Sequence, residues 1–143
     1  MEKKQIIVVD GIIGAGKSVL CNLLSQRIKN SVYIPEPVEE WKDIGILQEF
    51  YASLGTNAQK YLSYEFQTYT FLTRVKKTIE YFEKFPEAEC FILERSIYTD
   101  KLFIEMQKEI VGEMRMKMYY EWWNLWKKIY PIDFDKHDTT FVY

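Results

Sequence analysis

The segment Gly11-Ile-Ile-Gly-Ala-Gly-Lys-Ser18 constrains this chain more than any other feature of its sequence. It matches the pattern GxxxxGK[ST] in full. The apolar run Gln5–Val9 precedes it, and Lys17–Ile28, with apolar residues at helical spacing, follows it. A strand, a glycine-rich turn and a helix in this order are typical of a phosphate-binding loop, or P-loop. The pattern therefore predicts an α/β fold whose first turn holds phosphate groups.

The residue types of this loop suit the chemistry. Glycines let backbone N–H groups approach phosphate oxygens, and the start of the following helix adds partial positive charge. Lys17 would contact the β and γ phosphates, and the Ser18 hydroxyl would ligate Mg²⁺. We therefore predict that the loop binds ATP or another nucleoside triphosphate through Gly11, Ile12, Ile13, Gly14, Ala15, Gly16, Lys17 and Ser18. A glycine-rich turn with an accidental lysine is the alternative, and the flanking strand and helix argue against it.

Apolar periodicity predicts the element order βαβααβααβ along the chain. The expected strands are Gln5–Val9, Ser31–Ile34, Glu89–Leu93 and Thr139–Tyr143. The expected helices are Lys17–Ile28, Asp43–Tyr51, Asn57–Phe82, Ile97–Ile110 and Glu113–Ile129. This order indicates an α/β fold with a parallel sheet flanked by helices on both faces. Since no repeat or linker interrupts the pattern, we expect a single domain over residues 1–143.

Composition narrows the class of protein. The 143 residues carry a formal net charge of -2, which argues against a nucleic-acid polymer as partner. No run reaches the 18 apolar residues of a membrane span, so we expect no membrane partner. The N-terminus runs straight into a strand without the pattern of a signal peptide, and a cytoplasmic location is expected. Cys21 and Cys90 lie in apolar segments and are expected to be buried thiols.

Three further segments carry candidate site residues. Glu36, between two prolines after the second strand, could accept a proton from a substrate hydroxyl, although it could also lie in a solvated turn. Gln67 in the long helix could pair with a nucleobase, or could lie on an exposed face. Glu94 and Arg95 follow the third strand, where a carboxylate and a guanidinium suit Mg²⁺ and phosphate. Alternatively, Glu94 and Arg95 are an ordinary acid–base pair on a loop, without a role in binding.

Together with the P-loop, these segments resemble the deoxynucleoside kinase family. The resemblance covers essentially the whole chain and rests on motifs in the family's order: Asp10–Ser18, Glu36-Pro-Val-Glu-Glu-Trp41, Tyr51, Phe66-Gln-Thr-Tyr69, Glu94-Arg-Ser96 and Phe141-Val-Tyr143. It implies ATP-dependent phosphorylation of the 5′-hydroxyl of a deoxynucleoside, with Mg²⁺ as cofactor. It also implies a homodimer, which aromatic-rich helices such as Tyr119–Tyr130 would allow, although they equally suit a core.

The resemblance also implies a role for each matching residue. Glu36 would be the general base that takes the 5′-hydroxyl proton, and Arg95 would lie near the 5′ oxygen and the transferred phosphate. Glu94 would act with Ser18 on the side of the metal ion. Tyr51 would contact the sugar 3′-hydroxyl, and Gln67 would read the base. Trp41 and Phe66 would form walls of the substrate pocket.

Arg74 and Asp100 bear on the choice of base. Arg74 lies seven residues after Gln67 and therefore on the same helix face. In the family, an arginine and an aspartate at these places mark kinases of deoxycytidine and deoxypurines, whereas thymidine-accepting members carry small or apolar residues. The resemblance therefore implies deoxycytidine, deoxyadenosine or deoxyguanosine rather than thymidine. An ordinary interhelical salt bridge is the alternative.

The family pattern continues beyond the strand matched by Thr139–Tyr143, with an arginine-rich lid, further helices and a fifth strand. We therefore expect this chain to be truncated at its C-terminus relative to the family. Two alternatives to a working deoxynucleoside kinase follow. The chain could be a weak or inactive nucleotide-binding fragment of the same fold, or a nucleoside monophosphate kinase. A GTPase-like switch is disfavoured, because neither NKxD nor a DxxG after the third strand occurs.

Overall fold

The structure is a computed structural model that describes residues 4–11 and 16–143. The chain divides into two compact units. The sheet unit comprises Met1–Glu36, Lys77–Ser96 and Tyr130–Tyr143, and the helical unit comprises Pro37–Lys76 and Ile97–Ile129. Helix α4, Gln59–Lys84, contributes its first part to the helical unit and its last residues to the sheet unit. The expectation of one domain over residues 1–143 stays a prediction.

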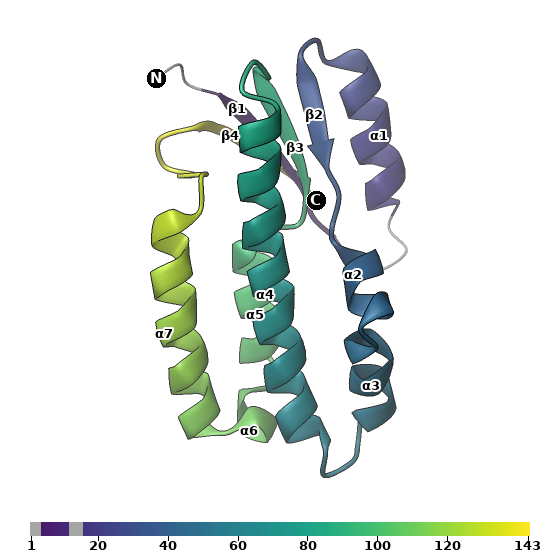
Figure 1. Cartoon of the computed structure of the whole chain (residues 1–143), viewed down its shortest axis with the longest axis vertical. Coiled ribbons are helices and arrows are strands. Elements are labelled where there is room, and N and C mark those ends of the chain that lie inside the picture. The colour runs from purple at the N-terminus through teal and green to yellow at the C-terminus, as the bar shows by residue number, and fades with distance from the viewer. Residues whose placement is uncertain (1–3, 12–15) are drawn as a thin grey trace. The chain divides into compact units, whose positions relative to one another are not determined.

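The sheet unit contains a parallel four-stranded sheet with the order β2-β3-β1-β4 (Figure 1). Its strands are β1 Gln5–Val9, β2 Ser31–Ile34, β3 Cys90–Glu94 and β4 Asp138–Val142. All three strand pairs are parallel, and Val9 aligns with Glu94 on one side and Val142 on the other. The carboxyl ends of the strands therefore meet at one edge of the sheet, the edge where ligands bind in open α/β sheets.

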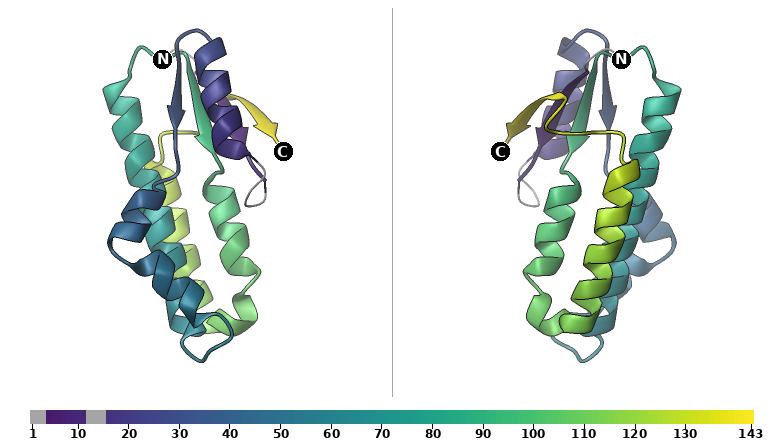
Figure 2. Two further views of the ribbon diagram at one scale, coloured as in Figure 1. Left: turned by 90° about the vertical axis from the view of Figure 1, so that its right-hand side faces the viewer. Right: turned by 90° about the vertical axis from the view of Figure 1, so that its left-hand side faces the viewer.

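Helices cover both faces of this sheet (Figure 2). Helix α1, Lys17–Arg27, packs on one face over a buried cluster. The cluster consists of Ile7, Val9, Cys21, Cys90 and Ile92. On the other face, the ring of Phe82 near the end of α4 stacks on Phe91, with centroids 4.1 Å apart. The predicted fold class, a parallel sheet with helices on both faces, is confirmed. Both cysteines are buried free thiols, as expected.

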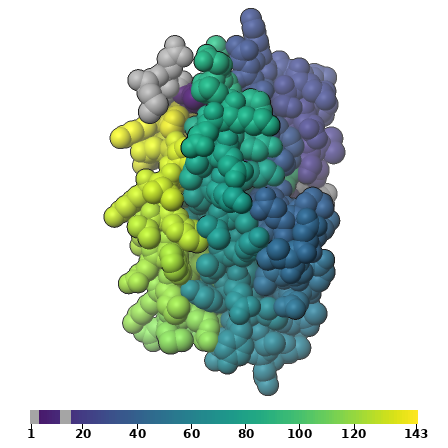
Figure 3. All heavy atoms as spheres, in the orientation of Figure 1, coloured from purple at the N-terminus to yellow at the C-terminus, as the bar shows by residue number. Residues whose placement is uncertain are grey.

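The helical unit is built around aromatic contacts between α4 and α7. Its helices are α2 Val38–Asp43, α3 Ile46–Ser53, the first part of α4, α5 Ile97–Glu105, α6 Lys108–Val111 and α7 Glu113–Ile129. The fully buried ring of Phe71 on α4 stacks with Trp123 and Trp126 of α7. Figure 3 shows α7 beside α4 on the face turned to the viewer. The Trp123 indole N–H also donates to the Ile97 carbonyl, which ties α5 to α7.

Two of the predicted helices are wrong in extent. Residues 43–51, expected as one helix, include only the last residue of α2, a helix that was not predicted, and α3 begins at Ile46, because Gly45 adopts a left-handed φ of 87° that breaks the helical repeat. Residues 97–110, also expected as one helix, divide into α5 and α6 at Gln107, whose φ of -111° lies outside the helical range. The remaining predicted bounds differ from the observed ones by no more than two residues.

Among the residues that the structure describes, no helix combines the length and the apolar character that crossing a membrane requires.

Candidate active site

The described residues on either side of the predicted phosphate-binding loop have the local structure that the sequence predicts. Strand β1 ends at Val9, and helix α1 begins at Lys17. Gly16 precedes the helix with a left-handed φ of 82°, a conformation that glycine adopts without strain. The Gly11 N–H donates to the Asp10 carboxylate at 2.8 Å. The predicted phosphate contacts Ile12, Ile13, Gly14 and Ala15 lie outside the described residues.

A hydrogen-bonded group surrounds Glu94, the last residue of β3. The Ser18 hydroxyl, in the first turn of α1, donates to Glu94 Oε1 at 2.5 Å. The Tyr33 hydroxyl, on β2, donates to the same oxygen at 3.2 Å. Glu94 is 7% exposed and Lys17 is 9% exposed, whereas Ser18 lies on the exposed side of this group. The structure thus brings together two of the predicted site residues, Ser18 and Glu94, and adds Tyr33.

The surroundings of Glu94 and Tyr33 shift their pKa values in opposite directions. Burial raises the pKa of Glu94, but hydrogen bonds with Ser18, Glu36 and Tyr33 and the charge of Lys17 lower it, and the net pKa lies below the ordinary value. Burial and the negative charge of Glu94 raise the pKa of the Tyr33 hydroxyl. At neutral pH Glu94 is therefore a carboxylate and Tyr33 keeps its proton to donate.

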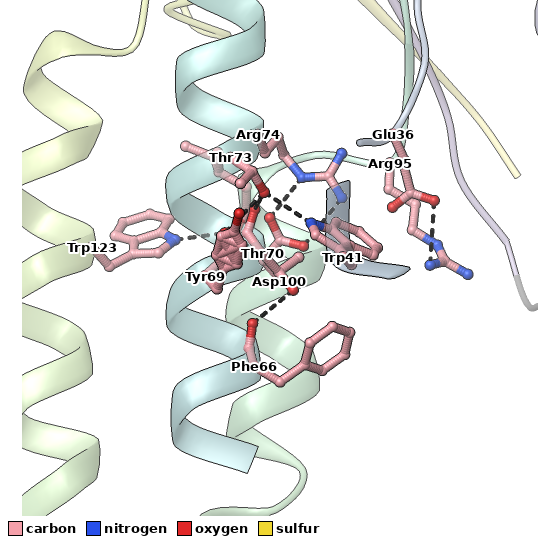
Figure 4. Close-up of polar contacts among 11 residues, drawn as sticks. Glu36, Trp41, Phe66, Tyr69, Thr70, Thr73, Arg74, Arg95, Asp100 and Trp123 are labelled. Atoms are coloured by element: carbon pink, nitrogen blue, oxygen red, sulfur yellow. Dashed lines mark hydrogen bonds and ion pairs between the residues drawn. The ribbon is translucent and has the colours of Figure 1, made fainter. Parts of the chain in front are cut away.

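Glu36 and Arg95 form an ion pair in the sheet unit. The Arg95 Nη1 lies 3.6 Å from Glu36 Oε1, and both side chains are largely buried (Figure 4). The backbone of Arg95 has a φ of 62°, a left-handed conformation that costs energy for a residue with a side chain. Its N–H donates to the Val9 carbonyl at 2.8 Å. Such strained residues cluster at functional sites, where surrounding contacts hold them.

The Arg95 side chain also reaches the start of the phosphate-binding segment, since its Nη2 donates to the Gly11 carbonyl at 3.5 Å. Glu36 is also among the groups that lower the pKa of Glu94, so the two carboxyl groups are neighbours. The predicted catalytic pair and the predicted metal-side acid therefore form one connected group in the sheet unit. A base, a guanidinium and a P-loop arranged in this way suit transfer of a phosphoryl group to a hydroxyl.

Three predicted substrate-binding residues of the helical unit lie in or beside an aromatic cluster. Trp41 and Phe66 make an edge-to-face contact with centroids 5.7 Å apart, and Phe50 stacks on Phe66 at 4.7 Å. The Trp41 indole N–H donates to the Thr73 hydroxyl at 2.9 Å, as Figure 4 shows. The ring of Tyr51 lies beside that of Phe50, with centroids 5.5 Å apart, and Tyr51 is 51% exposed.

Gln67 is buried, which rules out the exposed helix face that the sequence left open. Gln67 is 4% exposed, and its side-chain Oε1 has no hydrogen-bond partner in the described part of the chain. A buried amide oxygen without a partner costs about 1–3 kcal/mol of desolvation. An amide held in this way is suited to a ligand that supplies a donor.

Arg74 and Asp100 form a two-point ion pair between α4 and α5. Arg74 Nε donates to Asp100 Oδ2 at 2.6 Å, and Arg74 Nη2 donates to Oδ1 at 3.2 Å (Figure 4). Their side chains are 7% and 2% exposed. The interhelical salt bridge, which the sequence left open as the alternative role of these two residues, is therefore present.

A comparison with protein-family models decides the family. The model of deoxynucleoside kinases matches residues 7–143. The chain belongs to the deoxynucleoside kinase family. The family expected from the sequence motifs is thus confirmed.

Curated relatives of this deoxynucleoside kinase family member include viral and vertebrate proteins. A probable deoxycytidine kinase of fowlpox virus (strain NVSL) is 37% identical over 112 residues, 78% of this chain and 44% of that protein. Human deoxycytidine kinase is 29% identical over 135 residues, 81% of this chain and 52% of that protein. The mitochondrial deoxyguanosine kinase of Xenopus laevis is 28% identical over 136 residues, 80% and 49% of the two chains. The chain spans about half the length of these relatives.

Sequence reasoning missed three side chains that contact predicted site residues of this kinase family member. Tyr33 donates to Glu94, Thr73 accepts from Trp41, and Phe50 stacks on Phe66. Phe50 and Thr73 read as ordinary helix residues. For Tyr33 a signal existed, because a hydroxyl-bearing residue near the end of a buried strand is a candidate neighbour of the acids that follow the next strand.

Proposed function

We propose that this chain catalyses ATP-dependent phosphorylation of the 5′-hydroxyl of a deoxynucleoside. The sheet unit supplies the phosphate-binding segment Gly11–Ser18 and the catalytic residues Glu36 and Arg95. For nucleoside binding we propose the residues that the family resemblance marks: Trp41, Tyr51, Phe66, Gln67, Arg74 and Asp100. The family membership and the kinase names of the curated relatives support this proposal.

The observation that carries the proposal is the contact of Arg95 with both Glu36 and Gly11. A carboxylate beside a guanidinium can take a proton from a hydroxyl while the guanidinium faces negative charge on the transferred group. The Gly11 carbonyl connects this pair to the segment that would hold the triphosphate. Phosphoryl transfer depends chiefly on such positioning and charge stabilisation.

The residues around Glu94 fit a Mg²⁺ ion. A hydroxyl oxygen and a carboxylate oxygen are the hard ligands that this ion prefers, and Ser18 and Glu94 would supply them. When bound, the ion would neutralise negative charge on the phosphate groups of the nucleotide. In the described residues no group of three or more His, Cys, Asp and Glu side chains is arranged to hold a metal ion. Mg²⁺ is usually held by one or two carboxylates together with phosphates and waters, and Glu94 would be such a carboxylate.

For the base, we propose that deoxycytidine, deoxyadenosine and deoxyguanosine are preferred over thymidine. The Arg74–Asp100 pair and the partnerless Oε1 of Gln67 support this preference. The exocyclic amino group of cytosine or a purine can donate to an acceptor such as an Asp100 oxygen, whereas thymine has carbonyl oxygens in place of amino groups and an additional methyl group at C5.

A binding function without turnover is the second candidate. The chain spans about half the length of the curated relatives it matches. The two candidates share ligand binding and differ in turnover.

One experiment separates them. Binding of deoxycytidine, deoxyadenosine, deoxyguanosine and thymidine is measured by calorimetry, and ADP release is followed with each nucleoside and MgATP. Nucleoside binding together with nucleoside-dependent ADP release supports the kinase. Binding without release favours the second candidate. A chain that binds none of the four nucleosides would contradict both.

We further propose that the chain forms a homodimer through α7. Five exposed apolar side chains recur along this helix at intervals of three or four residues: Met114, Met118, Trp122, Leu125 and Ile129. Residues at this spacing share one helix face, and an apolar stripe of this kind is suited to a partner surface. A second copy with the same stripe is the simplest complementary partner.

A further inference from the structure

Tyr33 is placed to reach Glu94 by the register of the sheet. In the parallel pair of β2 and β3, Tyr33 aligns with Ile92. Side chains two positions apart on a strand share a face, so Tyr33 and Glu94 lie on the same face of neighbouring strands, offset along them. A long aromatic side chain can span such a diagonal, whereas a short hydroxyl residue cannot. The 3.2 Å hydrogen bond from the Tyr33 hydroxyl to Glu94 Oε1 is therefore specific to a tyrosine at this position.

Two hydroxyls from different elements converge on one carboxylate oxygen. Ser18 of α1 donates to Glu94 Oε1 at 2.5 Å, and Tyr33 of β2 donates to the same atom. The Tyr33 ring packs against the buried cluster beneath α1, so core packing fixes the position of the hydroxyl. One donor would still allow the Glu94 carboxylate to rotate. Two donors on the same oxygen, each fixed by its own element, restrict that rotation.

We propose that Tyr33 is a positioning residue that orients Glu94 toward the Mg²⁺ ion of a bound nucleotide. The inference rests on the proposed function, which assigns Ser18 and Glu94 to that ion. When the Ser18 hydroxyl donates its hydrogen to Glu94, its oxygen lone pairs stay available to a cation. The orientation of Glu94 therefore also sets the orientation of Ser18, and Tyr33 acts on both through Glu94.

The size of the effect follows from the behaviour of outer partners of metal ligands. Removal of such a partner typically lowers metal affinity by roughly 10–100-fold. Because Ser18 remains as a second donor on Glu94, we expect a loss near the lower end, roughly 10-fold. Binding of ATP without Mg²⁺ should not change, since Tyr33 acts on the metal side alone.

The test is a Mg²⁺ titration at fixed ATP, followed by calorimetry, on the full chain and on Tyr33→Phe. The substitution keeps the packed ring and removes only the hydroxyl. We expect Tyr33→Phe to need roughly 10-fold more Mg²⁺ for half-maximal binding, with ATP binding in EDTA unchanged. Tyr120→Phe is the matched control, because Tyr120 donates to the Glu105 carboxylate at 3.0 Å in the helical unit. It should titrate like the parent.

A second measurement checks that the effect runs through Glu94. In a Glu94→Ala background, Tyr33→Phe should have no further effect on the Mg²⁺ dependence. Equal Mg²⁺ curves for parent and Tyr33→Phe, or equal losses of ATP affinity with and without Mg²⁺, would overturn the positioning role and leave the proposed function intact. A parent whose ATP binding is indifferent to Mg²⁺ would instead overturn the magnesium site itself.

Discussion

The Arg74 guanidinium and the Asp100 carboxylate make a two-point contact between α4 and α5, with Arg74 Nε 2.6 Å from Asp100 Oδ2. Both side chains are almost completely buried. A buried ion pair is costly to break from one side, because the remaining charge has no compensation, whereas removing both charges is far less damaging.

Single and double variants of this pair should therefore differ in stability. We expect Arg74→Met or Asp100→Ala alone to lose about 3–5 kcal/mol of the free energy of unfolding, and the double variant to lose less than either. Urea denaturation measures this. In nucleoside calorimetry the double variant should shift preference toward thymidine. Removal of the two charged side chains frees the space that the methyl group of thymine needs. An unchanged order of the four nucleosides would mean that the pair has only a structural role.

Glu36→Gln should keep nucleoside binding and lose most phosphoryl transfer. The amide preserves the shape of the side chain and can still accept from Arg95, but it cannot act as a base. General base assistance is worth about 10²–10⁴-fold in rate. The measurement is nucleoside-dependent ADP release. The matched control is Glu39→Gln. The Glu39 side chain is 83% exposed, so this substitution should not change the rate of ADP release. Parent-like turnover of Glu36→Gln would remove Glu36 from the mechanism.

Lys17→Ala should lose binding of MgATP while the fold persists. The residue stands at the first position of α1, where its ammonium group would meet the β and γ phosphates. Calorimetry with MgATP measures the loss, and circular dichroism checks the fold. Lys29→Ala, an exposed lysine beyond the other end of α1, is the control and should bind normally. Tight MgATP binding by Lys17→Ala would show that the P-loop assignment is wrong.

The Cys21 thiol should be unreactive in the folded protein. Burial and the negative charges of Glu94 and Glu36 raise its pKa to about 12, against the partial opposing effect of Lys17. The unfolded thiol has an ordinary pKa of 9.0. The native chain therefore holds the proton more tightly, and the stability contributed by the neutral thiol is present below pH 9.0 and declines as the pH rises toward about 12.

Thiol labelling with a disulfide reagent tests this on a Cys90→Ala variant, which isolates Cys21. At pH 8 the labelling rate should be slow and should rise sharply across the urea unfolding transition. Rapid stoichiometric labelling of the folded chain would contradict the buried environment of Cys21. Stability curves at pH 8 and pH 10.5 should show a loss at the higher pH that is smaller in a Cys21→Ala variant, which keeps the buried Cys90 thiol with its raised pKa.

The stripe on α7 predicts self-association. A double variant, Leu125→Glu with Ile129→Glu, places two negative charges on the exposed apolar face of α7. The native side chains are 54% and 60% exposed, so the fold of the monomer should tolerate these charges. We expect a dimeric parent and a monomeric variant in sedimentation velocity. Ile44→Glu is the control, because Ile44 is 61% exposed and lies outside the stripe. A monomeric parent would disprove the proposed dimer.

Several features were predictable because they depend on residues close together in the sequence. The strand before the P-loop and the helix after it follow from local apolar patterning, and Gly16 adopts the left-handed conformation that glycine permits before Lys17. The same local reasoning correctly placed all four strands, with bounds one residue off at most. It failed at Gly45, where a single left-handed residue inside one expected helix separates α2 from α3.

Partners of site residues depended on the tertiary structure, because they join positions far apart in the chain. Tyr33 and Glu94 are 61 residues apart, and only the pairing of β2 with β3 sets the offset that lets the hydroxyl reach the carboxylate. Trp41 and Thr73 meet through helix packing that no local pattern specifies. The sequence alone thus determined which residue types could bind a triphosphate. Strand register and helix packing decided which of them are close enough to hold one another in place.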